Sequence, residues 1–218
     1  FTTAMTGYLE TISDPSFSGQ IVMQTYPLIG NYGVIPSDFE SRTPLLFAYV
    51  VREWCEAPSN FRSQGNLDAF LKEKGIIGLS GVDTRCITRI IREQGVMNAA
   101  IVSEYPADLA AFAAGLKQYK VVGAVEAATC KDITVDESPE DTRRVVLWDF
   151  GAKQNIQREL KKRGCTVIRV PAHTPAETIL SYKPNGLMLS NGPGDPKENL
   201  AIVEELKKIM ATGMPMFG

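Results

Sequence analysis

The chain has 218 residues, of which 44% are hydrophobic and 22% are charged, and its formal net charge is −2. This composition is typical of a soluble globular protein with one or two domains, and it gives no indication of nucleic-acid binding. No apolar run approaches the ~20 residues that a membrane-spanning helix needs, and the first residues lack the basic-then-apolar pattern of a signal peptide. We therefore expect a cytoplasmic protein with no nucleic-acid or membrane partner.

The cysteines lie far apart in the sequence, at Cys55, Cys86, Cys130 and Cys165. None forms a C-x-x-C pair and no histidine is near one, so the pattern predicts neither a zinc site nor a disulfide framework. We expect reduced thiols that are partly buried.

The segment after Asp83 has the periodicity of an amphipathic helix. Arg85, Arg89 and Arg92 follow one another at i, i+4 and i+7, and isoleucines occupy the opposite face. A basic stripe of this kind is usually a solvated face. A contact surface for a partner subunit is the alternative hypothesis.

A polar and acidic stretch, CKDITVDESPEDTRR, begins at Cys130 and is interrupted by Pro139. This composition is typical of a linker between domains. We therefore predict a first domain over residues 1–130, a linker over 131–144 and a second domain over 145–218.

The second part of the chain alternates short apolar runs with amphipathic segments. The predicted strands are 145–150, 166–170, 186–190 and 214–218, and the predicted helices are 152–164, 174–183 and 198–213. This alternation indicates right-handed crossovers and a parallel sheet covered on both faces. In such sheets ligands bind beyond the carboxyl ends of the strands, so the loop SNGPGDP after the third strand lies at the functional edge.

The loop SNGPGDP has the residues of a helix start and of an exposed backbone surface. Asp195 is a good N-cap, Pro196 suits the first helical position, and Glu198 fits a capping box. Gly192 and Gly194 leave their amide N–H groups uncovered, so the loop could donate to a carboxylate, a phosphate or an oxyanion. From the motif alone, a tight strand-to-helix turn with no ligand is an equally good interpretation.

Familiar motifs are absent from this loop and its surroundings. A Rossmann fingerprint would need glycine where Lys197 stands, and a P-loop would need G-K-[ST]. The sequence DFG at 149–151 has no other kinase motif with it and is interpreted as chance. A flavodoxin-like phosphate-binding module stays a weaker hypothesis that rests on the glycine loop. His173, the one histidine, follows the second strand and is expected in a surface loop.

Several blocks resemble one known family. FTTAMTGYLETISDPSFSGQIVMQTYPLIGNYGV and GVDTRCITRIIREQG closely resemble the small subunit of glutamine-dependent carbamoyl-phosphate synthase. DFGAKQNIQREL, RGCTVIRVPAHT, NGLMLSNGPGDP and MPMFG resemble, in the same order, the opening half of that subunit's glutamine amidotransferase domain. The resemblance covers nearly the whole chain, is weakest from about residue 106 through the linker, and makes the chain look cut at both ends.

The resemblance implies an α/β fold, with a mixed α/β N-terminal domain followed by the first half of a class I glutamine amidotransferase domain and its flavodoxin-like parallel sheet. It implies a glutaminase that supplies ammonia to the large subunit, which makes carbamoyl phosphate from bicarbonate and ATP for pyrimidine and arginine synthesis. The partners would be L-glutamine and the large subunit. No cofactor is expected in this subunit, since ATP and Mg belong to the large subunit.

The resemblance also assigns site residues. Gly192 and Gly194 match glycines whose backbone holds the substrate glutamine, and the Gly192 amide would also belong to the oxyanion hole. Ser16 matches a serine that reaches the glutamine α-carboxylate, although by itself it reads as a turn residue after Pro15. His173 matches no catalytic position.

The family's catalytic cysteine, histidine and glutamate match no residue of this sequence. The strand equivalent to MPMFG leads, in the family, into the nucleophile elbow that carries the cysteine. We therefore expect the 218 residues by themselves to be inactive. The alternative hypothesis is a noncatalytic relative that acts as a structural or regulatory partner of an ammonia-using synthetase, because Ser16, Gly192 and Gly194 fit either protein.

Overall fold

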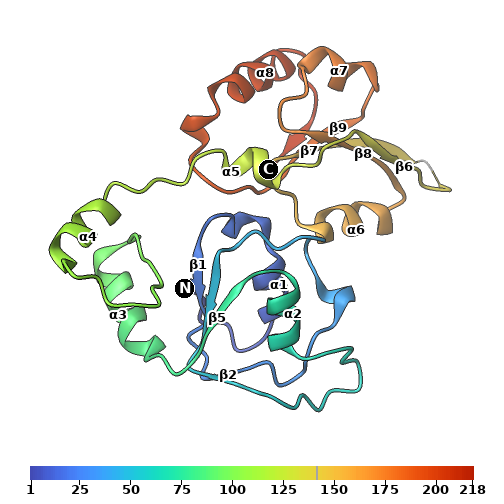
Figure 1. Cartoon of the computed structure of the whole chain (residues 1–218). Coiled ribbons are helices and arrows are strands. Elements are labelled where there is room, and N and C mark those ends of the chain that lie inside the picture. Colours follow the sequence, from blue (N-terminus) through green and yellow to red (C-terminus); the bar gives the residue numbers. More distant parts are fainter. Residues whose placement is uncertain (141) are drawn as a thin grey trace. The chain divides into compact units, whose positions relative to one another are not determined.

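The computed structural model describes residues 1–140 and 142–218, so Asp141 of the predicted linker lies outside the described residues. The chain divides into two compact units (Figure 1). The first unit comprises Phe1–Tyr8, Gly19–Ile35 and Leu46–Val122, and the second comprises Leu9–Ser18, Pro36–Leu45 and Gly123–Gly218. The grouping thus differs from the linear division at residue 130, because two short early segments pack with the end of the chain.

The first unit contains two small parallel sheets. One has the order β1 (Ile21–Met23), β3 (Ala48–Val50), β5 (Ile77–Leu79), and the other pairs β2 (Leu28–Ile29) with β4 (Glu53–Trp54). Its helices are α2 (Leu67–Glu73), α3 (Thr84–Gln94) and α4 (Leu109–Leu116). In the core, the buried Tyr49 hydroxyl donates to Gln24 Oε1 at 2.9 Å, which satisfies two polar groups that would be costly to bury unpaired.

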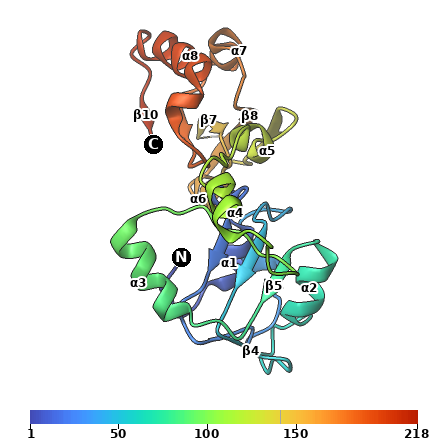
Figure 2. The ribbon, with the colours of Figure 1, turned by 60° about the vertical axis from the view of Figure 1, so that its left-hand side comes forward.

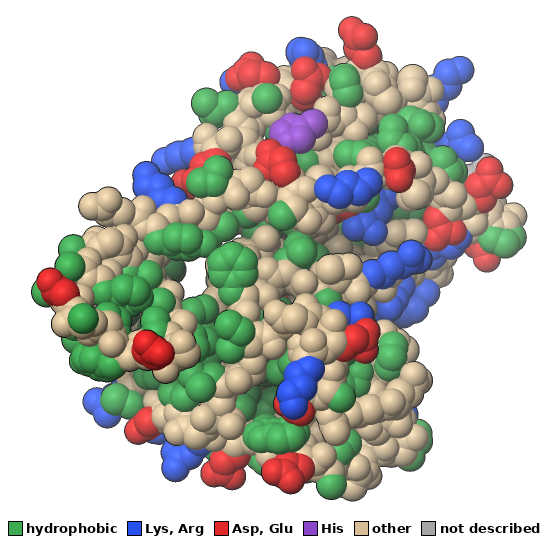
Figure 3. All heavy atoms as spheres, viewed as in Figure 1, with side chains coloured by type: hydrophobic (Ala, Val, Ile, Leu, Met, Phe, Trp, Pro, Cys, Tyr) green, Lys and Arg blue, Asp and Glu red, His purple; other side chains and the backbone are tan. Residues whose placement is uncertain are grey.

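Helix α3 begins where the sequence predicts, because Asp83 Oδ1 accepts a hydrogen bond from the Cys86 amide at 3.0 Å. The predicted arginine stripe is exposed on this helix. The opposite face is only partly covered, since Ile87 is 37% and Ile90 46% exposed, and hydrophobic side chains are visible over α3 and α4 in Figure 3.

The second unit contains one five-stranded sheet. Its order is β10 (Met216–Phe217), β9 (Gly186–Leu189), β7 (Arg143–Asp149), β8 (Cys165–Pro171), β6 (Thr134–Asp136). The four predicted strands run parallel, as expected, and β6 pairs antiparallel with β8. Strand β6 was not predicted, because it lies in the polar stretch interpreted as a linker. Because β6 is short and lies exposed at the edge of the sheet, most of its residues are polar, and its composition resembles that of a linker.

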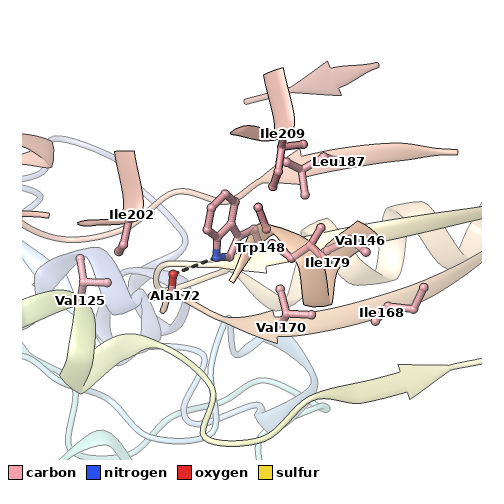
Figure 4. Close-up of a cluster of buried hydrophobic side chains, with 11 residues drawn as sticks. Val125, Val146, Trp148, Ile168, Val170, Ala172, Ile179, Leu187, Ile202 and Ile209 are labelled. Atoms are coloured by element: carbon pink, nitrogen blue, oxygen red, sulfur yellow. Dashed lines mark hydrogen bonds between the residues drawn. The ribbon is translucent and has the colours of Figure 1, made fainter. Parts of the chain in front are cut away.

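Helices cover both faces of this sheet, as the alternating pattern predicts (Figures 1 and 2). Helix α6 (Gln154–Lys162) packs Ile156 and Leu160 against Leu147 and Val167 on one face. On the other face lie α7 (Ala176–Ser181) and α8 (Leu200–Met210), and α5 (Ala124–Ala128) precedes β6. The cluster on that face includes Trp148, which is fully buried among aliphatic side chains from strands and helices (Figure 4).

The early segments of the second unit are attached to the start of α6. They contain most of α1 (Tyr8–Ser13) and the short 3-10 turns η1 (Pro15–Phe17) and η2 (Pro36–Asp38). The Glu40 carbonyl accepts from Gln154 N at 2.8 Å, and its carboxylate accepts from Asn155 N at 3.1 Å and from Asn155 Nδ2 at 2.7 Å. Because α6 has no side-chain cap of its own, Glu40 satisfies its free amides from 115 residues away.

We predict that Trp148→Phe lowers the free energy of unfolding by about 2–4 kcal/mol. The change removes the Nε1–H that donates to Ala172 O at 2.9 Å and leaves a void where the indole ring packed. The matched control is Trp54→Phe, since Trp54 is half-buried in the first unit and its loss should cost less than about 1 kcal/mol. Urea unfolding followed by far-ultraviolet circular dichroism measures both, and equal effects would contradict the prediction.

Candidate functional site

The predicted site residues lie where regular structure ends in the second unit. The loop after β9 carries Gly192 and Gly194, the loop after β7 runs from Phe150 to Lys153, and η1 carries Ser16. Both loops follow parallel strands at their carboxyl ends, which is the edge at which such sheets bind ligands.

Position 192 requires glycine because the loop after β7 approaches it closely at Phe150. A Cβ on Gly192 would lie 2.5 Å from the Phe150 carbonyl oxygen and 2.8 Å from Phe150 Cβ, so no other residue fits without moving the backbone. Gly194 is required for a different reason, because its φ of +82° is a left-handed conformation that side chains disfavour. Pro193, between them, is buried, and its ring packs toward Gly151.

The two glycine amides remain available in this loop. Among residues 1–140 and 142–218, neither the Gly192 nor the Gly194 N–H makes a hydrogen bond, and both glycines are exposed. The close packing that excludes a Cβ therefore coexists with N–H groups that a ligand could use.

The predicted helix start at Asp195 is wrong in its details. Asp195 Oδ1 accepts from Lys197 N at 2.9 Å, but it caps the short 3-10 turn η3 (Pro196–Glu198). The α-helix α8 begins later, at Leu200, after Asn199. Because a 3-10 turn uses the same capping residues as an α-helix, the sequence signals are alike.

Ser16 lies next to the glycine loop within the second unit, although its partner Asn191 is 175 residues away in the sequence. Asn191 Nδ2 donates to Ser16 Oγ at 2.8 Å and to Gly151 O at 3.1 Å, and Asn191 Oδ1 accepts from Lys153 N at 3.3 Å. Sequence reasoning missed Asn191. The available signal was its position as a small polar residue between the strand end and Gly192.

The loop after β7 is held by Asp149, whose side chain is fully buried. Its Oδ1 accepts from the amides of Gly151 at 2.8 Å and Ala152 at 2.6 Å. Its Oδ2 accepts from Cys130 N at 2.8 Å and from Arg169 Nε and Nη2 at 2.8 and 2.7 Å. The DFG sequence dismissed as a kinase motif thus has a structural role in this protein.

The thiol of Cys130, whose backbone amide donates to Asp149, is unsuited to nucleophilic attack. Burial, together with the Asp149 carboxylate, raises the pKa of Cys130 to about 12. A thiol with so high a pKa carries almost no thiolate at neutral pH, and the thiolate is the reactive form. Cys165, the other cysteine of the second unit, is buried at the start of β8, at the opposite end of the strand from the loops, so neither Cys130 nor Cys165 is placed to attack a ligand at the glycine loop.

Other candidates lie outside this site. His173, the purple side chain in Figure 3, is 52% exposed, and its Nε2 is 3.0 Å from Glu126 Oε1, in agreement with the surface position expected for it. Within residues 1–140 and 142–218 there is no disulfide and no cluster of three or more His, Cys, Asp or Glu side chains that could hold a metal ion. In the same residues, no helix is both long and apolar enough to cross a membrane.

We predict that Asp149→Asn lowers the free energy of unfolding by about 3–4 kcal/mol, because Arg169 loses its partner and an amide NH2 meets backbone donors. The matched control is Asp136→Asn in β6. Asp136 pairs with Lys161, which lowers the pKa of the carboxyl group, but its side chain is 43% exposed. A pair this exposed contributes about 0–1 kcal/mol. Urea unfolding of both variants checks this, and a loss at Asp149 no larger than at Asp136 would refute it.

Comparison with known proteins covers the whole chain. Residues 1–101 match the model of the carbamoyl-phosphate synthase small chain, CPSase domain, and residues 146–218 match that of class-I glutamine amidotransferases. The carbamoyl phosphate synthase small chain of Bacillus anthracis is 49% identical over 218 residues, and that of Listeria monocytogenes is 48% identical over 220. The pyrimidine-specific small chain of Bacillus subtilis is 47% identical over 219 residues.

All of this chain is covered in each of these alignments, but it spans only 59% of the length of each relative. The resemblance and the α/β fold class inferred from the sequence are confirmed. The 218 residues belong to the carbamoyl-phosphate synthase small-chain family, with its CPSase domain in their first part and a class-I glutamine amidotransferase domain in their last part.

Proposed function

We propose that this chain is part of the glutaminase subunit of a carbamoyl-phosphate synthase. It binds L-glutamine at Ser16, Gly192 and Gly194, and the complete subunit hydrolyses it to glutamate and ammonia. The observation that carries this proposal is the meeting of Ser16 with the glycine loop, since Asn191 Nδ2 lies 2.8 Å from Ser16 Oγ and directly precedes Gly192. A hydroxyl group and uncovered amides at one place suit a substrate that has a carboxylate and an amide carbonyl.

The proposed reaction is acyl transfer. The thiolate of a catalytic cysteine, which matches none of the four cysteines of this sequence, attacks the amide carbon of glutamine and forms a tetrahedral oxyanion. The Gly192 N–H donates to that oxyanion while Ser16 and the Gly194 backbone hold the amino-acid end. Collapse of the intermediate releases ammonia and leaves a thioester, which water hydrolyses to glutamate and free thiol. We expect the 218 residues alone to be inactive.

The partner in this proposal is the large synthetase subunit. It receives the ammonia and makes carbamoyl phosphate from bicarbonate and ATP, with Mg, so that this subunit needs no cofactor of its own. The product would serve pyrimidine and arginine synthesis in the cytoplasm. Support for the pyrimidine branch comes from the Bacillus subtilis relative, which is named pyrimidine-specific.

The experiment uses the full-length polypeptide that carries this sequence, together with its large subunit. Glutamate release and carbamoyl phosphate formation are measured with glutamine or with ammonium as the nitrogen source. Glutamine-dependent synthesis supports the proposal. Synthesis from ammonium alone, with no glutamate released from glutamine, would favour the noncatalytic relative instead.

We predict that Gly192→Ala lowers glutaminase kcat by about 10²–10³-fold, the usual effect of losing one oxyanion donor. The added Cβ would lie 2.5 Å from Phe150 O, so the loop must move and carry its amide away from the reacting oxygen. Ammonium-dependent synthesis should stay unchanged because it bypasses this site. A variant that loses both activities together would contradict the assigned role.

Gly194 and Gly213 provide a matched pair for the same assay. Their φ angles are +82° and +73°, and an added Cβ would find no atom within 3.4 Å at either position, so alanine strains the backbone similarly in both. Gly194→Ala should raise the KM for glutamine, whereas Gly213→Ala, after α8, should leave it unchanged. Equal kinetic effects would remove Gly194 from the site.

A further inference from the structure

Ser190 connects the end of β9 to the peptide unit that carries the Gly192 amide. The residue follows β9 directly, and its backbone N–H donates to Trp148 O at 3.1 Å, which continues the sheet by one residue. Its hydroxyl group is used twice, because Oγ accepts from Phe150 N at 2.9 Å and donates to Asn191 O at 2.6 Å. A side chain anchored to the sheet therefore holds the carbonyl oxygen that directly precedes Gly192.

The Asn191 carbonyl and the Gly192 N–H belong to the same peptide unit. This peptide bond is trans, and in a planar trans unit the C=O and N–H groups point to opposite sides, so a bond that fixes one direction also fixes the other. The carbonyl points to Ser190 Oγ, and the Gly192 N–H is consequently turned away from that hydroxyl. If the unit turned over, an acceptor oxygen would occupy the side on which the donor now lies.

The neighbouring contacts place the two residues of this unit without deciding its rotation. Phe150 O packs closely on Gly192, since an added Cβ would lie 2.5 Å from it, and Asn191 Nδ2 donates to Gly151 O at 3.1 Å. These contacts involve a Cα and a side chain. Among residues 1–140 and 142–218, the bond from Ser190 is the one hydrogen bond made to the C=O or N–H of the unit itself.

We propose that Ser190 is a positioning residue for the oxyanion donor: its hydroxyl holds the peptide unit between Asn191 and Gly192 in the orientation that presents the Gly192 N–H to the reacting oxygen. This inference rests on the proposed function of the site. Ser190 itself touches no reacting atom and acts through the peptide unit. Because the oxyanion exists only after attack on the amide carbon, loss of the hydroxyl lowers kcat more than it weakens glutamine binding.

The test compares two side chains of the same shape at position 190, in the full-length protein with its large subunit. Ser190→Thr and Ser190→Val add the same bulk, but only threonine keeps a hydroxyl group. The glutaminase kcat of Ser190→Val should be about 10-fold below that of Ser190→Thr, the effect of one lost hydrogen bond, with KM values within about 3-fold. Synthesis from ammonium should be equal in both variants.

A double-mutant cycle with Gly192→Ala tests whether Ser190 acts through the amide. Ser190→Ala should lower kcat about 10-fold in the wild-type protein but less than about 2-fold in the Gly192→Ala background, where the amide has already moved. Costs that simply add would overturn the proposal. If neither Ser190→Ala nor Ser190→Val folds, Ser190→Cys runs the same cycle with an expected loss of about 3-fold, because a thiol is a weak donor.

Thr212→Val is the matched control for loss of a hydroxyl that joins two backbone groups. Thr212 Oγ1 donates to Ile209 O at 2.7 Å and accepts from Met214 N at 3.4 Å. Thr212 precedes β10, which runs parallel to β9, so it lies at the opposite end of the sheet from the glycine loop. Its loss should leave kcat and KM at their wild-type values. An equal fall in kcat for Thr212→Val and Ser190→Val would refute the proposal.

The outcomes distinguish the two proposals. If the wild-type protein hydrolyses no glutamine, the proposed function fails and this inference fails with it. If wild type is active but Ser190→Val and Ser190→Thr have the same kcat, or Ser190→Val changes only KM, the function stands and the inference is overturned. A lowered kcat that threonine restores, and that Gly192→Ala masks, supports it.

Discussion

The buried carboxylate of Asp149 is the constraint on which the candidate site depends. A charge with no exposure costs several kcal/mol unless donors match it, and here the amides of Cys130, Gly151 and Ala152 and the guanidinium of Arg169 do so. Any other path of the loop after β7 would unpair the charge. These contacts stabilise the described conformation of the loop, in which its carbonyls and amides are partners for the neighbouring segments.

Close packing of glycines follows from that fixed loop. A Cβ on Gly151 would lie 3.1 Å from Pro193 Cδ and 3.3 Å from Pro15 Cβ, so Gly151 lies between the glycine loop and η1. Gly192 in turn packs on Phe150. The two interpretations of the glycine loop, a tight turn or a ligand site, are therefore compatible. The absence of Cβ permits the packing and also leaves the Gly192 N–H uncovered.

Periodicity predicted the regular elements well because their signals are local. The strand and helix alternation of 145–218, the cap of α3 at Asp83 and the two covered sheet faces were all available from residues a few positions apart. Local patterns did not predict three other features: the edge strand β6, the start of α8, and the packing of segments 9–18 and 36–45 with the second unit. Strand β6 and the two early segments depend on partners far along the chain, as Val135 pairs with Ile168. The start of α8 was missed for a local reason, because the 3-10 turn η3 before it has the same capping residue that an α-helix would have.

The site residues were the least predictable from local patterns, and their positions explain why. Ser16 was identified only through family resemblance, and Asn191 was missed, because their contact joins positions 175 residues apart. Neither lies in an α-helix or a strand, so main-chain ladders do not fix them. Side-chain contacts hold them instead. Asp14 accepts from Ser16 N and pairs with Lys153 Nζ, and Asn191 accepts from Lys153 N and donates to Ser16 Oγ. A site built beyond the ends of strands therefore needs polar residues whose partners no periodicity reveals.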